Sequence, residues 1–249
     1  MLRNHVPRIR LFLPAVALIG TSAFLASCGS SNAATEVLDV SVPAELTPQT
    51  NQAGFGSAAC VRADGSAPQQ RAFSAAPQKC IETAKSYVAT MKTSKGTMVF
   101  DLLDDAAPIT VNSFVNLARA KYYDGIYFHR VVPEFVLQAG DPGATSEAGI
   151  AGAGAGGPGY QFVNELPAAG AYQVGSLAMA NAGPDTNGSQ FFIISGVNGT
   201  QLPPSYSLFG QLTADPANLV TMNAIAGLAV QDGPPSQPVV IESLTVAEK

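Results

Sequence analysis

The sequence predicts a mainly β protein, a closed antiparallel barrel with helices at its ends. It contains about eight short strand-like segments at hairpin-like spacing and about two helical segments. It lacks the regular alternation of strand and helix that a parallel sheet requires. Periodicity by itself indicates a β-rich barrel or sandwich, and the spacing of the strands favours the closed barrel.

The chain begins with a segment that predicts export, residues 1–27. Three arginines precede an apolar run over residues 11–25, which is short for a membrane span. The run ends in LASCG at residues 25–29, which resembles a bacterial lipobox. This predicts a diacylglycerol on Cys28 and an anchor to the outer face of the bacterial cytoplasmic membrane. The alternative is an ordinary secretory signal cut after Ala26 or Ser27, which leaves Cys28 unmodified.

Two further segments precede the predicted domain. Residues 28–50 are rich in Ser, Ala, Thr, Pro and Asn without a sustained period, so we expect a flexible tether. Residues 51–86 form an N-terminal extension with the two remaining cysteines, Cys60 and Cys80. In an exported chain such a pair favours a disulfide, and two unpaired thiols are the alternative. Residues 87–249 then form one domain.

The charge pattern excludes one class of partner. The net charge is −5, only 12% of residues are charged, and no Lys/Arg cluster follows the export signal. Because binding to phosphates needs such a cluster, no nucleic-acid partner is expected.

The first half of the domain begins as a β-hairpin. Residues 87–93 alternate as a half-buried strand, a turn follows, and residues 97–102 return. Pro108 opens a helix that ends near residues 122–125. Its apolar positions recur at helical spacing: Ile109, Val111, Phe114, Val115, Leu117 and Ala118. Residues 126–132 predict a strand, which Pro133 interrupts, and residues 135–138 predict the next one.

A glycine- and alanine-rich loop follows over residues 143–159. Residues 152–157 formally satisfy G-x-G-x-x-G, the fingerprint of dinucleotide binding. That fingerprint needs a helix directly after it, whereas Pro158 and Gly159 follow here. We therefore expect a mobile surface loop, and no cofactor or metal.

The rest of the domain continues the β pattern. Residues 175–180 and 190–194 predict strands on either side of a turn-rich loop, and residues 208–212 predict another. Asp215 caps a helix that begins at Pro216 and runs to about Gly227. Residues 238–246 alternate as a final strand.

Two segments carry a resemblance to a known family: FHRVVPEFVLQAGD at residues 128–141 and AMANAGPDTNGSQFFI at residues 178–193. They resemble the active-site strands and loop of the cyclophilin-type peptidyl-prolyl cis-trans isomerases, and the similarity covers about residues 87–246. The resemblance implies a cyclophilin-like barrel of eight strands capped by two helices. It also implies that the protein accelerates rotation about X-Pro bonds in exported, proline-containing polypeptides.

The resemblance implies Arg130 and Gln138 as the catalytic pair. A twisted X-Pro amide gains a lone pair on the prolyl nitrogen, and a fixed cationic donor stabilises that state selectively. Arginine stays protonated and has a pre-organised planar fork. Gln138 matches the glutamine that supports the arginine, although Pro133 prevents period-two counting from fixing its side. His129 lies on the opposite face of the strand from Arg130, and we expect a structural, hydrogen-bonded histidine.

The resemblance also implies an apolar pocket for the proline ring. Val136 stands where methionine is common, and Asn181 lies in an edge that binds an extended peptide through its backbone. The implied substrate-binding residues are Phe135, Val136, Ala180, Asn181, Ala182, Gln190, Phe192, Leu202 and Tyr206.

Two positions depart from the family pattern. Gln201 stands where many eukaryotic members have a tryptophan, so weak binding of cyclosporin-type macrocycles is expected. Tyr206 stands where they have a histidine. Relative to the family spacing, this chain has one extra residue between Phe192 and Gln201. The assignments of Leu202 and Tyr206 depend on how that residue is accommodated.

Three functions fit the sequence. An anchored, monomeric isomerase is favoured, because pure binding does not require a cation matched to a twisted amide. A proline-peptide-binding chaperone module with little turnover is the main alternative. A surface lipoprotein that uses the fold only as a scaffold is the third.

Overall fold

The structure is a computed structural model that describes residues 50–51, 54–82 and 84–249, with side chains from residue 54 onward. The described residues belong to one compact unit, Glu45–Lys249. The predicted export signal, the lipidation site Cys28 and the tether up to residue 49 lie outside them. Among the described helices, none is long and apolar enough to cross a bilayer.

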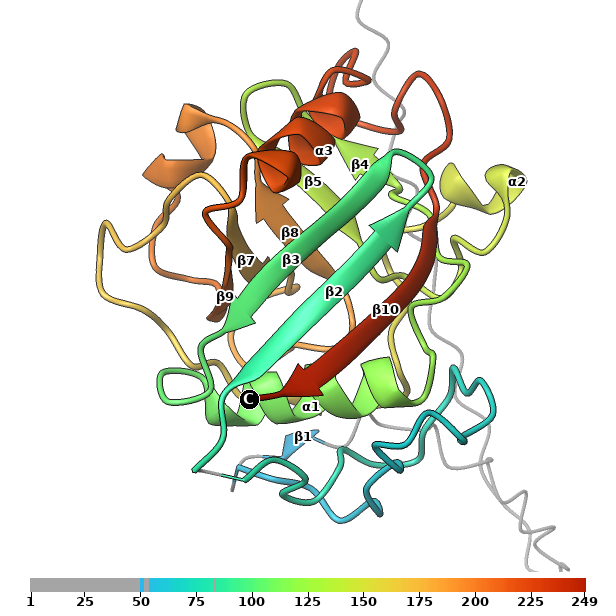
Figure 1. Cartoon of the computed structure of the whole chain (residues 1–249), viewed down its shortest axis with the longest axis vertical. Helices are drawn as coiled ribbons and strands as arrows, with labels where there is room; N and C mark the ends of the chain where they lie inside the picture. Colours follow the sequence, from blue (N-terminus) through green and yellow to red (C-terminus); the bar gives the residue numbers. More distant parts are fainter. Residues whose placement is uncertain (1–49, 52–53, 83) are drawn as a thin grey trace, which may run out of the picture. The chain divides into compact units, whose positions relative to one another are not determined.

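One antiparallel sheet of eight strands forms the domain (Figure 1). Its order is β10-β2-β3-β9-β7-β8-β5-β4. The strands are β2 (Tyr87–Thr93), β3 (Gly96–Leu102), β4 (Arg130–Val131), β5 (Val136–Ala139), β7 (Ser176–Met179), β8 (Phe191–Ile194), β9 (Leu208–Leu212) and β10 (Ile241–Glu248). The predicted hairpin is present as β2–β3, and it pairs Thr93 with Gly96, a residue that was expected in the turn.

The sheet curls into a half-barrel, so the closed barrel expected from the sequence is not confirmed. Its two outer strands, β4 and β10, share no ladder. An isolated bridge between Tyr127 and Val240 links the segments that precede them. The strand expected over residues 126–132 is reduced to β4. Residues before β4 bond to the segment that leads into β10: the NH of Phe128 donates to the carbonyl of Val239, and the carbonyl of Ile126 accepts from the NH of Ile241.

Within the described residues three α-helices accompany the sheet, one more than the sequence predicted. α1 (Pro108–Arg119) begins at its proline, and α3 (Pro216–Ala226) is capped by Asp215, whose side chain accepts from the NH of Ala217 at 2.9 Å. In Figure 1, α1 lies below the curled sheet and α3 above it. The additional helix is α2 (Glu147–Ile150), a single turn within the glycine-rich segment that was expected to be only a loop.

Ser146 explains why α2 forms. Its side chain accepts a hydrogen bond from the NH of Gly149 at 3.2 Å, which caps the turn. A short 3₁₀ helix, η1 (Val197–Gln201), and a small parallel sheet of β1 (Thr50–Asn51) and β6 (Gln161–Phe162) complete the elements.

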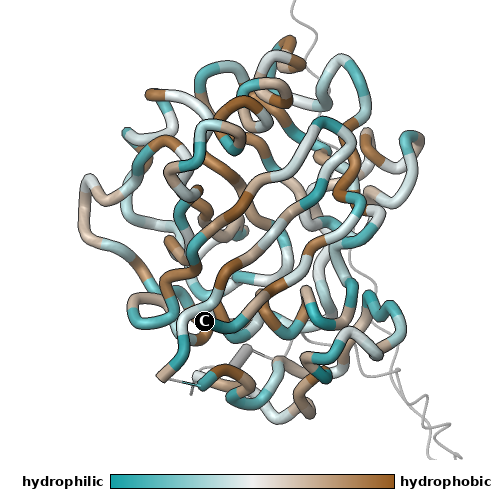
Figure 2. The backbone as a smooth tube through the Cα atoms, viewed as in Figure 1, coloured by the Kyte–Doolittle hydropathy of each residue, from teal (hydrophilic) through white to brown (hydrophobic). Residues whose placement is uncertain are grey.

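The core lies inside the curl of the sheet. Figure 2 shows hydrophobic and hydrophilic residues alternating along the strands, as expected when one face of each strand is buried. Phe114 of α1 stands at the centre, with ring centroids 5.2 Å from Tyr123, 5.9 Å from Phe191 and 4.9 Å from Phe209. Such tilted and edge-on aromatic pairs add specificity to the burial of apolar area.

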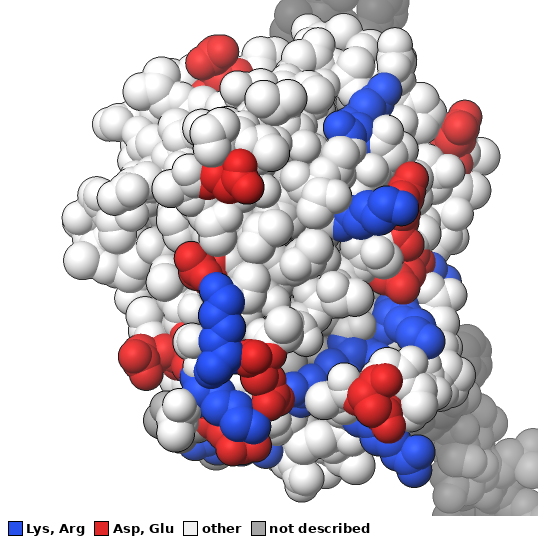
Figure 3. Space-filling model, in the orientation of Figure 1, with Lys and Arg blue, Asp and Glu red and all other residues white. Residues whose placement is uncertain are grey.

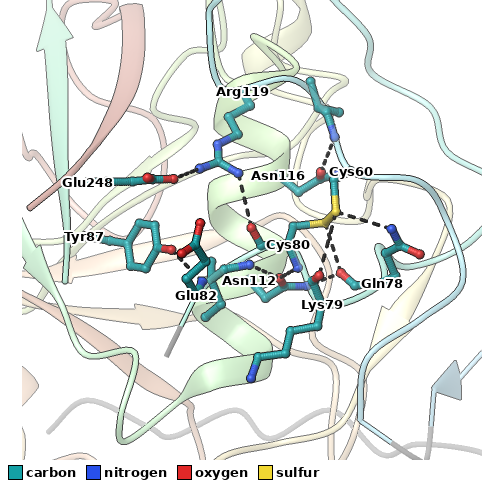
Figure 4. Close-up of a disulfide and its surroundings, with 12 residues drawn as sticks. Cys60, Gln78, Lys79, Cys80, Glu82, Tyr87, Asn112, Asn116, Arg119 and Glu248 are labelled. Carbon is teal, nitrogen blue, oxygen red and sulfur yellow. Dashed lines mark hydrogen bonds and ion pairs between the residues drawn. A yellow bond between two sulfur atoms is a disulfide. The ribbon is translucent and has the colours of Figure 1, made fainter. Parts of the chain in front are cut away.

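The N-terminal extension packs along α1 and is held by a disulfide between Cys60 and Cys80, the pairing that the sequence favoured (Figure 4). The side chain of Asn116 accepts from the NH of Val61 at 2.9 Å. Ala76 and Ile81 of the extension are buried in the main core. The extension is therefore an ordered part of the domain from residue 54 onward, with residue 83 undescribed.

Charged side chains are sparse on the face seen in Figure 3, and acidic and basic groups lie next to each other there. Arg119 and Lys85 both pair with Glu248, at 2.7 Å each. These pairs join the end of the extension and α1 to the last strand.

Candidate functional site

Four residues form one row across the sheet. Arg130 of β4 pairs with Gln138 of β5, Gln138 pairs with Phe192 of β8, and Phe192 pairs with Ala178 of β7. Directly opposed residues of antiparallel strands project from the same face. The register therefore places Arg130 and Gln138 on one face, which counting across Pro133 could not establish.

This face carries an apolar patch that is separate from the main core. The buried members are Val136, Tyr172, Ala178, Phe192 and Ile194, and the partly buried members are Val132, Phe135, Ala180, Leu202, Tyr206 and Leu208. We call these residues the outer patch. The neighbouring strand residues, such as Leu137 and Ile193, belong to the main core. Strict alternation along β5 and β8 thus divides their residues between the core and the outer patch.

Aromatic and tyrosine contacts hold the outer patch together. Phe192 and Tyr206 pack edge to face, with ring centroids 5.3 Å apart. The hydroxyl of Tyr172 donates to the carbonyl of Tyr206 at 2.7 Å and accepts from its NH at 3.1 Å. Tyr172 therefore fixes the backbone that presents Tyr206.

Arg130 lies beside the outer patch with its guanidinium held from three sides. Nη1 donates to Oε1 of Gln138 at 3.3 Å, and the carbon of the guanidinium lies 5.9 Å from the ring centroid of Phe135. The carboxylate of Asp232 accepts from Nε at 2.5 Å and from Nη2 at 2.9 Å. The arginine side chain remains 31% exposed.

A chain of side-chain amides continues from Arg130. Nε2 of Gln138 donates to Oε1 of Gln190 at 3.1 Å. Nε2 of Gln190 donates in turn to the carbonyl of Gly156 at 2.9 Å and to Asp141 at 3.3 Å. The catalytic candidates are thereby connected to the glycine-rich loop.

Asp141 anchors that loop. Its buried carboxylate accepts from the NH groups of Gly143, Gly154 and Gly156 at 2.6 to 2.8 Å. Burial by itself raises the pKa of Asp141, but the three backbone donors outweigh it and the pKa is lowered. A single side chain therefore ties three separate points of the glycine-rich loop together.

The segment expected to bind an extended peptide follows β7. The NH of Ala180 donates to the carbonyl of Gln190 at 2.9 Å, and the NH of Ala182 donates to the hydroxyl of Thr186 at 2.8 Å. Within the described residues, no intramolecular hydrogen bond engages the backbone of Asn181. The backbone of Asn181 is thus available to a ligand.

Of the nine predicted substrate-binding residues, six belong to the outer patch, whereas Asn181, Ala182 and Gln190 do not. Phe135, Val136, Ala180, Phe192, Leu202 and Tyr206 belong to the outer patch, including the two positions affected by the extra residue. Gln201 is exposed in η1, directly before Leu202.

His129 differs in one respect from the expectation. It is buried, but neither ring nitrogen makes a hydrogen bond of good geometry within the described residues. Burial lowers the pKa of the imidazole, and the nearby Asp141 carboxylate opposes this effect. His129 is therefore a buried histidine next to Asp141 and Gln190, and the hydrogen bond that was predicted for it is not confirmed.

Sequence reasoning missed three residues of this face: Asp232, Asp141 and Tyr172. Asp141 ends the first family-like segment, and three glycine amides bind it from up to fifteen residues further along the chain. Asp232 and Tyr172 lie in loops without periodicity, so no local signal ties them to Arg130 or Tyr206.

Comparisons with known proteins identify the family of this chain. The family model for "Cyclophilin type peptidyl-prolyl cis-trans isomerase/CLD" matches residues 88–246, more than half of the chain. A "Probable peptidyl-prolyl cis-trans isomerase B" of Mycobacterium leprae is 40% identical over 175 residues, which cover 63% of this chain and 55% of that protein. "Peptidyl-prolyl cis-trans isomerase B" of Streptomyces anulatus is 39% identical over 182 residues, covering 66% of this chain and 98% of that protein. The chain thus spans about half the length of the mycobacterial relative.

Solved structures show the same fold. A Cryptosporidium parvum cyclophilin-type peptidyl-prolyl cis-trans isomerase aligns with a TM-score of 0.57 and 27% identity, covering 66% of this chain and 99% of that one. A second structure of that protein, determined in the presence of the dipeptide Ala-Pro, aligns with a TM-score of 0.56 and 28% identity. The chain therefore belongs to the cyclophilin-type peptidyl-prolyl cis-trans isomerase family.

Proposed function

We propose that this protein is a peptidyl-prolyl cis-trans isomerase that acts on proline-containing polypeptides. The observation that carries the proposal is the row in which Arg130 and Gln138 stand beside Phe192 and the outer patch. A cation that donates hydrogen bonds borders an apolar surface. These two features match the nitrogen of a twisted prolyl amide, which accepts a hydrogen bond, and the apolar proline ring.

Rotation about an X-Pro bond requires the loss of amide resonance, with a barrier of about 18–20 kcal/mol. The reaction needs no nucleophile and no proton transfer. The outer patch holds the proline ring, and the backbone of Asn181 binds the extended peptide next to it. The remaining task is to favour the twisted amide over both planar forms.

Arg130 performs that task. In the twisted state the prolyl nitrogen gains a lone pair, and an N–H of the guanidinium donates to it. Gln138 holds Nη1 from the neighbouring strand, and Phe135 packs near the guanidinium. The donor is therefore in place before the amide twists, so little reorganisation is needed in the transition state.

The decisive experiment measures exchange between the cis and trans forms of a capped proline peptide by NMR, with and without protein. We expect acceleration by the wild type and a loss of about a hundredfold in kcat/KM for Arg130→Ala. Lys92→Ala is the control, because Lys92 is an exposed cation on β2 that pairs with Glu242. Equal rates for Arg130→Ala and wild type exclude the mechanism, and absence of acceleration by the wild type excludes the function.

We also propose that the protein acts outside the cytoplasm on exported clients, anchored by lipid on Cys28. The LASCG motif at residues 25–29 and the disulfide between Cys60 and Cys80 support this location, since disulfides persist in oxidising compartments. Mass spectrometry of the membrane-extracted protein tests it. A diacylglyceryl mass on a fragment that begins at Cys28, lost in Cys28→Ala, is expected. An unmodified Cys28 contradicts the anchor.

A further inference from the structure

Asp232 binds the guanidinium of Arg130 with both carboxylate oxygens, along the edge formed by Nε and Nη2. One carboxylate oxygen accepts from Nε at 2.5 Å and the other from Nη2 at 2.9 Å. Such a fork-to-fork pair fixes the plane of the guanidinium as well as its position. A contact to only one nitrogen would leave the plane of the guanidinium free to rotate.

The chain places Asp232 there through its backbone. Asp232 lies in the connection between α3 and β10, and the carbonyl of its neighbour Gly233 accepts from the NH of Val131 at 2.8 Å. Val131 directly follows Arg130 on the outer strand β4. The connection therefore occupies the edge of β4 that a closed barrel would have paired with β10, and this brings the carboxylate to the arginine.

The hydrogen-bond inventory shows what the pairing leaves for a substrate. A guanidinium has about five N–H donors. Asp232 takes one on Nε and one on Nη2, and Gln138 takes one on Nη1. The remaining donors therefore sit on Nη1 and Nη2, one on each, and their directions are fixed by the two partners.

The ion pair between Asp232 and Arg130 is expected to contribute little to the free energy of unfolding. The Asp232 side chain is 63% exposed and that of Arg130 is 31% exposed, and ion pairs at such positions contribute little to folding. Arg130 is also the only lysine or arginine between residues 122 and 248. No other cation of that long segment competes for the carboxylate.

We propose that Asp232 is a positioning residue for the isomerisation: its carboxylate holds the plane of the Arg130 guanidinium so that the remaining N–H groups face the twisted amide. This inference rests on the proposed function. It predicts that loss of the carboxylate lowers the turnover of bound substrate more than the binding of substrate, because Asp232 acts on a contact made in the transition state.

The test compares Asp232→Asn, Asp232→Glu and Glu242→Gln with wild type. Glu242→Gln is the matched control, since Glu242 is an exposed carboxylate that pairs with Lys92 away from the outer patch. The measurements are kcat and KM for a capped proline peptide, the melting temperature, and the ¹⁵N–¹H resonance of Arg130 Nε.

For Asp232→Asn we expect a fall of about fivefold in kcat with little change in KM, an unchanged melting temperature, and a shifted Arg130 Nε resonance. Asp232→Glu retains a carboxylate and is expected to recover most of kcat. The Glu242→Gln control is expected to match wild type in every measurement.

The result that overturns the inference is an Asp232→Asn variant with unchanged or higher kcat in a protein whose activity does depend on Arg130. Failure of the proposed function looks different. In that case the wild type does not accelerate exchange at all, while the Arg130 Nε resonance still reports the ion pair through its response to Asp232→Asn.

Discussion

The side-chain oxygen of Asn112 accepts a hydrogen bond from the NH of Cys80 at 2.6 Å. It also accepts from the NH of Ile81 at 3.2 Å, and Nδ2 of Asn112 donates to the carbonyl of Gln78 at 2.9 Å (Figure 4). One buried carboxamide of α1 thus satisfies three backbone groups of the N-terminal extension. The half of the disulfide that contains Cys80 is held against α1 independently of its sulfur.

The disulfide is expected to stabilise the protein without supporting catalysis. It joins cysteines 20 residues apart, and a loop of this size predicts a loss of about 3 kcal/mol in the free energy of unfolding for the double variant Cys60→Ser, Cys80→Ser. Urea unfolding with and without a thiol reductant measures the loss. The isomerisation rate under native conditions is expected to stay unchanged. A reduced wild type as stable as the oxidised one contradicts the prediction.

Gln138 is expected to matter for turnover because it links Arg130 to Gln190. Replacing it in Gln138→Ala removes the bond to Nη1 at 3.3 Å and the bond to Gln190 at 3.1 Å. Hydrogen bonds to charged groups contribute about 1.5–3 kcal/mol, so kcat/KM is expected to fall about tenfold or more. Gln211→Ala is a suitable control, since Gln211 of β9 bonds to Ser176 instead. Equal losses in the two variants would show that the effect is not specific to the site.

Asp141 is expected to be essential for the order of the glycine-rich loop. Asp141→Ala leaves three backbone donors without their acceptor, which predicts a loss of about 3 kcal/mol in the free energy of unfolding. Limited proteolysis is expected to cut residues 143–159 in this variant before the rest of the domain. Glu147→Ala is the control, because Glu147 is exposed in the same loop. A loop that stays resistant in Asp141→Ala would refute the assignment.

His129 predicts a pH dependence of stability. Because burial lowers its pKa below 6.5 in the folded state, the unfolded chain takes up the proton first as the pH falls. The free energy of unfolding is therefore expected to decrease below about pH 6.5, by up to about 1.4 kcal/mol per pH unit. Above that pH the group has no effect. Urea unfolding of wild type and His129→Gln at pH 7.5, 6.5 and 5.5 compares the slopes, and parallel slopes would contradict the prediction.

Local patterns predicted most of the fold. The hairpin of β2 and β3, the start of α1 at Pro108 and the cap of α3 at Asp215 each depend on residues close together in the chain. Closure of the barrel depends instead on whether β4 and β10 pair, although about 110 residues separate them. The alternation of residues within a strand does not predict such a pairing. The half-barrel follows from the absence of that pairing, because β4 and β10 share no ladder.

The residues of the candidate site also divide into those that local sequence predicts and those that only distant contacts bring together. Arg130, Gln138 and Phe192 were found from consecutive family-like positions, and the register then placed them in one row. Asp232 reaches Arg130 from 102 residues away, through a loop whose position is set by a backbone bond to Val131. A contact of this kind leaves no trace in composition or spacing, so only the folded chain shows it.

The connection that lies along the edge of β4 in place of β10 has an evolutionary implication. A strand paired with β10 at that edge would tie any change near Arg130 to the packing of the whole barrel. Residues 228–240 are a connection, with Gln231, Asp232 and Gly233 close to the surface. Under the proposed function, substitutions there would alter the position of the Arg130 guanidinium while the hydrophobic interior stays intact, so the rate of isomerisation could change independently of the thermodynamic stability.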